Sequence, residues 1–124
     1  MRLTEHRRSF LALYVMALLV ITLGPLPAGG EYVEAVPGLD KAIHVVLFGG
    51  LAFLLMWNAV REGRARAFIK VFGLTVAAAG LIELMQAPLP YRSGDVWDFL
   101  AGAVGALIGA AVATAMLGAL SGRD

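Results

Sequence analysis

Eight polar or ionisable residues with the chemistry of a binding or catalytic site stand out in an otherwise apolar chain. Carboxylates and imidazole serve as general acids, general bases or metal ligands, whereas Lys and Arg bind phosphate or carboxylate groups. The candidate ligand-binding residues are Asp40, Lys41, His44, Glu83, Gln86, Arg92, Asp95 and Asp98. The candidate catalytic acids and bases among them are His44, Glu83, Asp95 and Asp98. No established metal-binding motif is present, so none is assigned as a metal ligand from sequence.

The elements that position these residues belong to a membrane protein. Hydrophobic residues make up 60% of the 124 residues and charged residues only 15%, compared with about 45–50% and about 25% in soluble domains. A soluble protein of this length could not bury so much apolar surface. The absence of cysteine excludes disulfides and thiolate chemistry. The distribution of basic residues indicates membrane topology rather than nucleic-acid binding.

Four stretches are long enough to cross a bilayer as helices, which requires about 20 apolar residues. We therefore predict an all-α fold in which a single domain, residues 1–124, forms an integral membrane bundle of four transmembrane helices. The predicted helices cover residues 9–27, 40–60, 68–87 and 95–120. The first stretch also fits a cleavable secretory signal, but its long apolar run and the nearby Pro25 and Pro27 favour a retained helix.

Basic residues predict the orientation of the bundle. Lys and Arg cluster in the amino-terminal segment and in the connection after residue 60, whereas the segments 28–39 and 88–94 contain only Arg92. Because cytoplasmic loops are enriched in Lys and Arg, we expect the amino terminus, the middle connection and the carboxyl terminus to be cytoplasmic. The candidate residues then lie near the outer side of the membrane.

Helical spacing predicts that the candidate residues face one another. Asp40 and His44 are four residues apart, and Glu83 and Gln86 are three apart, so each pair shares a helix face. Three helix ends thus bring polar groups to a similar depth in the outer leaflet, where ionisable residues indicate a functional site. The sequence predicts a shared, outward-facing polar pocket.

A stripe of small residues predicts how the last helix packs. Gly102, Gly105 and Gly109 form a small-residue face of the kind that lets membrane helices approach closely. This face continues from Asp95 and Asp98. We expect the fourth helix to be central, with its glycine face against the second or third helix, and this packing would draw both aspartates toward the other candidates.

Several candidates also have a purely structural interpretation. Asp40 and Asp95 could each cap the amino terminus of a helix. Lys41 and Arg92 could neutralise the acids or extend to lipid headgroups. Capping does not account for Glu83, because this residue lies near the carboxyl end of its helix.

The ordered motifs resemble those of the VanZ-like membrane protein family. They are Asp40-Lys41-xx-His44-xxx-Phe48, Glu83-xx-Gln86 and Arg92-Ser93-Gly94-Asp95-xx-Asp98, followed by Gly102, Gly105 and Gly109. The resemblance covers residues 37–115 and departs at residues 99–102, which lack an Asn often found in the family. It implies a bacterial, multi-pass protein of the cytoplasmic (inner) membrane with a role in the cell envelope. The founding member is associated with resistance to the glycopeptide teicoplanin, and the resemblance supplies no reaction.

Two functions follow from these observations. In the first, the pocket binds a lipid headgroup or a lipid-linked cell-wall precursor. In the alternative, the protein is a membrane-embedded hydrolase or transferase, metal- or acid/base-dependent, that acts on such a lipid. A polar network that only fixes helix packing is a third interpretation. Membrane lipids are the expected partners and nucleic acid is not, while the cofactor, the ligand's identity and a homo-oligomeric state stay open.

Overall fold

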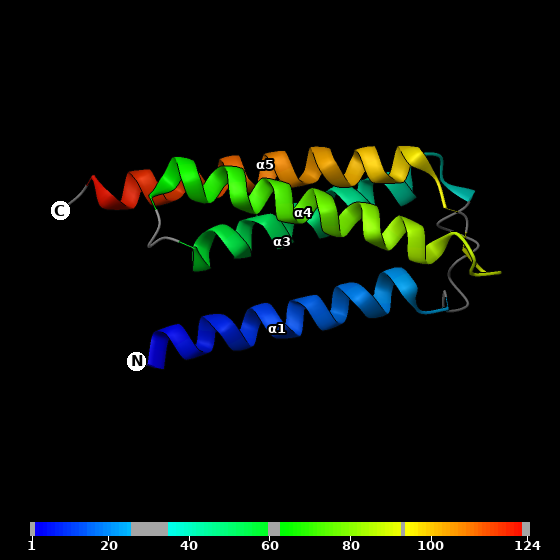
Figure 1. Cartoon of the computed structure of the whole chain (residues 1–124), viewed down its shortest axis with the longest axis horizontal. Coiled ribbons are helices and arrows are strands. Elements are labelled where there is room, and N and C mark those ends of the chain that lie inside the picture. Colours follow the sequence, from blue (N-terminus) through cyan, green and yellow to red (C-terminus); the bar gives the residue numbers. More distant parts are fainter. Residues whose placement is uncertain (1, 26–34, 60–62, 93, 123–124) are drawn as a thin grey trace.

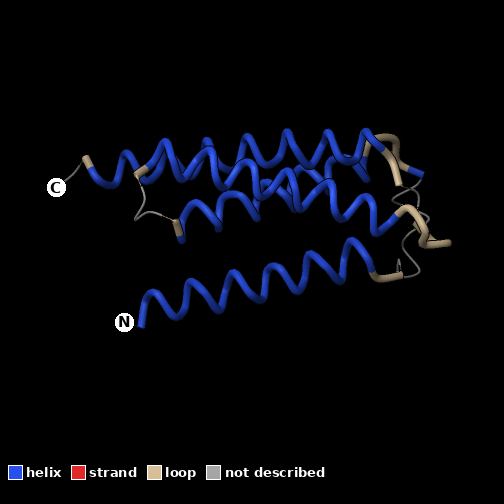
Figure 2. Tube along the Cα trace, in the orientation of Figure 1, coloured by secondary structure: helices blue, strands red, loops and turns tan. Residues whose placement is uncertain are grey.

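The computed structural model describes residues 2–25, 35–59, 63–92 and 94–122. These parts of the chain form four α-helices (Figures 1 and 2). The helices are α1 (Arg2–Leu23), α3 (Leu39–Asn58), α4 (Arg64–Gln86) and α5 (Val96–Ser121). Each is long and apolar enough to cross a membrane, and a helix satisfies its own backbone hydrogen bonds in lipid. The prediction of an all-α chain with four candidate spans is confirmed.

The helix ends differ from the predicted ones by a few residues. α1 ends at Leu23 instead of residue 27, because Gly24 precedes Pro25 and proline disfavours helix at the residue before it. α5 begins at Val96 because Asp95 has an extended backbone (φ −134°, ψ 126°) and acts as the N-cap. α1 and α4 both begin earlier than predicted, since the Arg-containing segments before their apolar runs are also helical and Arg is a good helix former.

The directions of the helices bring the polar residues to one end of the bundle. α3 and α5 run parallel to each other, whereas α1 and α4 run the opposite way (Figure 1). The starts of α3 and α5 therefore lie beside the ends of α1 and α4. We call this the acidic end, because it carries Asp40, Glu83, Asp95 and Asp98. Both chain termini lie at the other end (Figure 1).

Glycine residues bring α3 and α5 into backbone contact. A Cβ atom on Gly49 of α3 would lie 3.1 Å from the carbonyl oxygen of Gly105 in α5. A Cβ on Gly105 or on Gly109 would collide with the backbone of α3. α5 also packs against α4. The expected central position of the last helix is confirmed, and its glycine face meets α3.

α1 packs against α3 and α4 through a narrow strip. Among its described side chains only Leu18 and Thr22 are buried. Leu18 belongs to an apolar cluster that includes Ile82 of α4, and the Tyr14 hydroxyl donates a hydrogen bond to the carbonyl oxygen of Leu47 in α3 (2.8 Å). Most other apolar side chains of α1 face outward, as they do in a helix that contacts lipid.

Candidate functional site

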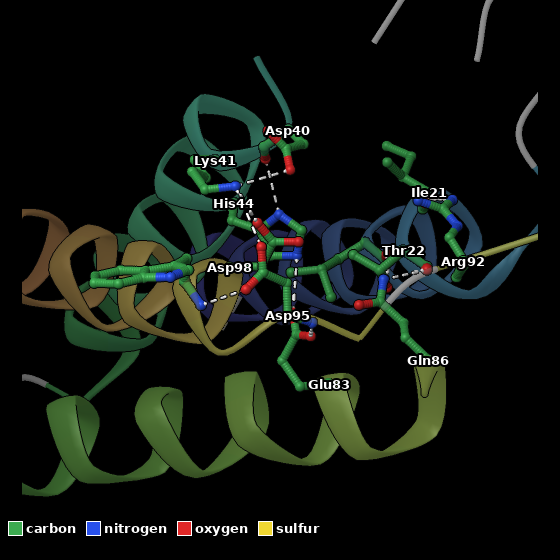
Figure 3. Close-up of polar contacts among 12 residues, drawn as sticks. Ile21, Thr22, Asp40, Lys41, His44, Glu83, Gln86, Arg92, Asp95 and Asp98 are labelled. Carbon is green, nitrogen blue, oxygen red and sulfur yellow. Dashed lines mark hydrogen bonds and ion pairs between the residues drawn. The ribbon is translucent and has the colours of Figure 1, made fainter. Parts of the chain in front are cut away.

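Six of the eight candidate residues come together at the acidic end (Figure 3). We call them the acidic cluster: Asp40, Lys41, His44, Glu83, Asp95 and Asp98. Three come from the first turns of α3, one from the end of α4 and two from the start of α5. The helix directions make these residues neighbours although they are far apart in sequence.

Lys41 is the cation that holds three carboxylates of the cluster together. Its Nζ atom lies 3.1 Å from Asp40 Oδ2, 3.3 Å from Asp98 Oδ1 and 3.5 Å from Asp95 Oδ2. An ammonium group has three donors, and each faces a carboxylate here. The side chain of Asp98 is only 8% exposed, so Lys41 balances a carboxylate that water barely reaches.

The ring of His44 is fixed in one orientation. Its Nδ1 atom lies 2.9 Å from the backbone carbonyl oxygen of Asp40. A carbonyl oxygen only accepts, so Nδ1 carries the hydrogen and donates it. In the neutral ring, Nε2 therefore presents its lone pair to Glu83 Oε1, which lies 3.3 Å away. Both atoms are buried without a hydrogen-bond partner, and a proton or a cation between them would make the contact favourable.

Glu83 joins the end of α4 to the start of α5. Its Oε2 atom accepts a hydrogen bond from the backbone N–H of Asp95 (3.1 Å), while Oε1 faces His44. The side chain is 11% exposed. One carboxylate oxygen thus has a structural role, and the other is directed at the imidazole and is available for chemistry.

The two aspartates considered as N-caps behave differently. Asp95 caps α5, because its Oδ1 atom accepts a hydrogen bond from the backbone N–H of Trp97 (3.0 Å). Asp40 is not a cap: Gly38 occupies the N-cap position of α3 with a positive φ of 79° and no side-chain hydrogen bond. The capping interpretation of Asp40 was wrong, and its carboxylate instead contacts Lys41.

The acidic cluster carries an excess of negative charge. Its four carboxylates and one ammonium group give a formal charge of −3 when the imidazole is neutral. Ionised groups are costly to bury unless they are paired. The cluster is therefore suited to a positively charged group or ion, and it does not favour a free phosphate.

The other two candidates, Gln86 and Arg92, bind the end of α1 and do not contact the cluster through any described hydrogen bond. Gln86 Nε2 donates to the carbonyl oxygen of Thr22 (2.6 Å). Arg92 Nη2 donates to the carbonyl oxygens of Ile21 and Gly24. Burial lowers the pKa of Arg92, but a guanidinium stays charged at neutral pH. We call Gln86 and Arg92, together with Tyr91 described next, the α1 clamp.

The α1 clamp includes a contact that sequence reasoning missed. The hydroxyl of Tyr91 donates to the carbonyl oxygen of Leu23 (3.1 Å). The last carbonyls of any helix lack donors within that helix, and Pro25 cannot supply an N–H after α1. The sequence therefore indicated that the last carbonyls of α1 lack hydrogen-bond donors. It could not show which residues would donate to them.

Comparison with known proteins agrees with the family resemblance that the motifs indicated. A family model described as VanZ/LLP1 matches residues 10–117. The chain belongs to the VanZ/LLP1 family. It is a multi-pass membrane protein with four candidate spans. No curated protein and no solved structure matches it.

In this VanZ/LLP1-family chain, an apolar groove between α4 and α5 leads to the acidic cluster. The groove has a volume of about 730 Å³. Ala77, Gly80 and Phe99 contribute to its apolar lining, and Glu83 and Asp95 line it at the helix ends. It is open to the surroundings of the bundle, so a lipid chain could enter from the side. The groove places an apolar surface beside two acidic residues of the cluster.

Proposed function

We propose that this protein binds a lipid headgroup or a lipid-linked cell-wall precursor at the outer face of a bacterial cytoplasmic membrane. The observation that carries the proposal is the groove between α4 and α5, which is apolar along its length and includes Glu83 and Asp95. A lipid chain would occupy the apolar part, and the headgroup would reach the acidic cluster. Ligand sites commonly combine an apolar lining with a few placed polar groups.

The charges of the site favour a headgroup with an amine. Lys41 is surrounded by carboxylates, and Arg92 is directed at the carbonyls of α1. Neither cation is placed to bind a phosphate in the groove. The formal charge of −3 favours a cationic group, as in an aminophospholipid or a precursor with a free amino group. Binding of such a precursor by this protein would alter the access of a glycopeptide antibiotic to the precursor.

The arrangement of the helices supports the orientation that we propose. Basic residues of α1 and α4, among them Arg8 and Lys70, lie in the halves of these helices remote from the acidic end. The positive-inside rule assigns the opposite, basic end of the bundle to the cytoplasm. The acidic cluster then faces outward. The α1 clamp supports retention of the first helix, because Gln86 and Arg92 would lose their carbonyl acceptors if α1 were removed.

Native mass spectrometry of the full chain in detergent tests the proposal. Ala77→Trp would fill the groove from an exposed position, and we expect it to remove a lipid adduct that the wild-type protein retains. Ile69→Trp is the matched control, since Ile69 lies on the same helix, is 72% exposed and is not part of the groove lining. Equal lipid occupancy in both variants and the wild type would contradict the proposal.

One observation favours an enzymatic alternative: His44 Nε2 and Glu83 Oε1 lie 3.3 Å apart and both are buried without a hydrogen-bond partner. A carboxylate beside an imidazole can take a proton from water or from a substrate hydroxyl and return it to a leaving group. This hydrolase or transferase would act on the same lipid. Turnover of the copurified lipid by the wild type and its loss in His44→Ala would favour the enzyme over the binding protein.

A further inference from the structure

Three residues from three different helices converge on one point of the acidic cluster. His44 of α3, Glu83 of α4 and Asp98 of α5 each offer a ligand atom, and these atoms all lie within 4.8 Å of one another. All three side chains are about nine-tenths buried, with exposures of 9%, 11% and 8%. One nitrogen and two carboxylate oxygens form a ligand set that suits divalent transition metals.

His44 is already oriented as a metal ligand. In metal sites, a coordinating imidazole usually donates its other ring N–H to a carboxylate or a backbone carbonyl, which fixes the tautomer. His44 Nδ1 makes this contact with the carbonyl oxygen of Asp40. The remaining nitrogen, Nε2, is buried, lacks a hydrogen-bond partner and is directed at the carboxylate of Glu83. Thus the hydrogen bond to the Asp40 carbonyl orients the ring, and the lone pair of Nε2 is available to a metal ion.

The spacing of the two unpaired atoms fits a coordinated ion better than a direct contact. Nitrogen and oxygen ligands bind Zn²⁺ at about 2.0–2.2 Å in a tetrahedral arrangement, which places neighbouring ligand atoms about 3.3–3.5 Å apart. His44 Nε2 and Glu83 Oε1 are separated by 3.3 Å. The ligand atom of Asp98 lies within 4.8 Å of both.

The balance of charge also favours a divalent cation. The cluster has a formal charge of −3 with Lys41 included, and a bound divalent ion would reduce it to −1. Lys41 lies 3.3 Å from Asp98 Oδ1 and therefore competes with the ion for this carboxylate. The competition lowers affinity, but the remaining negative charge still attracts the ion.

We propose that His44, Glu83 and Asp98 form a binding site for a divalent transition-metal ion, with Zn²⁺ as the best match to the ligand set and spacing. The site does not depend on the proposed lipid ligand. Asp40 supplies the carbonyl that orients the imidazole, and Lys41 sets the affinity by competing for Asp98.

Isothermal titration of the full chain with Zn²⁺, after removal of metals with EDTA, tests the site. We expect one Zn²⁺ per wild-type chain. The affinity should fall by more than about 100-fold in His44→Ala and in Glu83→Gln, because loss of a ligand costs more than the roughly 10–100-fold that loss of a residue supporting a ligand costs. His6→Ala is the matched control, because His6 is the chain's other histidine and is exposed near the start of α1; its affinity should equal that of the wild type.

A variant that binds Zn²⁺ more tightly than the wild type keeps the test valid even if the other variants misfold. Lys41→Met removes the competing ammonium group, so Zn²⁺ should bind more tightly. The visible absorption spectrum of the Co²⁺-loaded wild type should differ from that of aqueous Co²⁺ and revert in His44→Ala. Absence of Zn²⁺ binding, equal affinity in His44→Ala, or binding lost only in His6→Ala would overturn the site. Zn²⁺ binding by a wild-type protein without lipid adducts would refute only the lipid proposal.

Discussion

Gly105 of α5 lies against Gly49 of α3, and the carbonyl oxygen of each residue occupies space that a side chain on the partner helix would need. Gly109→Ala would push a methyl group into the Gly49 carbonyl. We expect this change to destabilise the bundle by about 1–3 kcal/mol, the usual cost of overpacking a close contact. Unfolding in mixed detergent micelles, followed by circular dichroism, measures the change in the free energy of unfolding.

Gly73→Ala provides the control for that substitution. Gly73 lies inside α4, and a Cβ atom there would meet nothing within 4 Å. Alanine is a better helix former than glycine by up to about 1 kcal/mol, so this variant should be as stable as the wild type or slightly more so. Equal destabilisation by both substitutions would show that the α3–α5 contact is not the cause.

Asp98→Asn tests whether the acidic cluster is built for a ligand instead of for stability. In the absence of metal, the carboxylate of Asp98 adds to an excess of negative charge while it is 8% exposed. Neutralising it should raise the free energy of unfolding by about 0.5–2 kcal/mol, the usual gain from a stabilising substitution. The measurement is thermal unfolding in EDTA.

Lys41→Met should have the opposite effect on stability in EDTA, because three carboxylates lose their shared cation. If Asp98→Asn and Lys41→Met both lowered stability, the cluster would be a balanced structural network, and the excess charge would not mark a ligand site. Sites kept for function are commonly less stable than the sequence could make them.

The α1 clamp predicts a specific way to loosen the first helix. Gln86→Leu removes the donor to the Thr22 carbonyl, which should cost about 0.6 kcal/mol, the average for interhelical hydrogen bonds in membranes, and at most about 1.7 kcal/mol. The wild-type chain has no cysteine, so paired cysteines at Leu18 and Ile82, which share an apolar cluster, can report docking. The disulfide yield should fall in Gln86→Leu, and an unchanged yield would mean that apolar packing alone holds α1.

Accessibility labelling tests the proposed orientation. A cysteine at Glu34, in the connection before α3 and outside the described residues, should react with an impermeant maleimide added to intact cells. A cysteine at Ser121, at the end of α5, should react only after the membrane is opened. Labelling of the Ser121 cysteine in intact cells would place the acidic cluster in the cytoplasm and contradict the proposed outward-facing site.

The sequence was most informative about the spans and about which residues meet at the acidic end. Both follow from properties within a segment, namely apolar length and the position of each polar residue along its helix. Asp40, His44 and Glu83 were placed at one depth because three helices begin or end there. The contacts of individual atoms, such as the carbonyl of Asp40 with His44 Nδ1, depend on backbone positions that no pattern specifies.

Sequence reasoning failed where the result depended on which helices pack together. Gln86 shares a turn with Glu83, so the two were expected to enter one pocket. In the structure Gln86 faces α1 while Glu83 faces α3 and α5. Residues three apart on a helix point in neighbouring but not identical directions, and α4 packs against α1, α3 and α5.

The parallel course of α3 and α5 affects the electric field at the acidic end. Two helix amino termini point there, and each carries roughly half a positive charge from its aligned peptide dipoles. They stabilise Asp40 and Asp98, which lie in the first turns of these helices. Glu83 instead lies at the carboxyl terminus of α4, where the dipole is negative. The backbone N–H of Asp95 supports its Oε2 atom, but Oε1 is buried without a hydrogen-bond partner, so this oxygen would gain from an arriving cation.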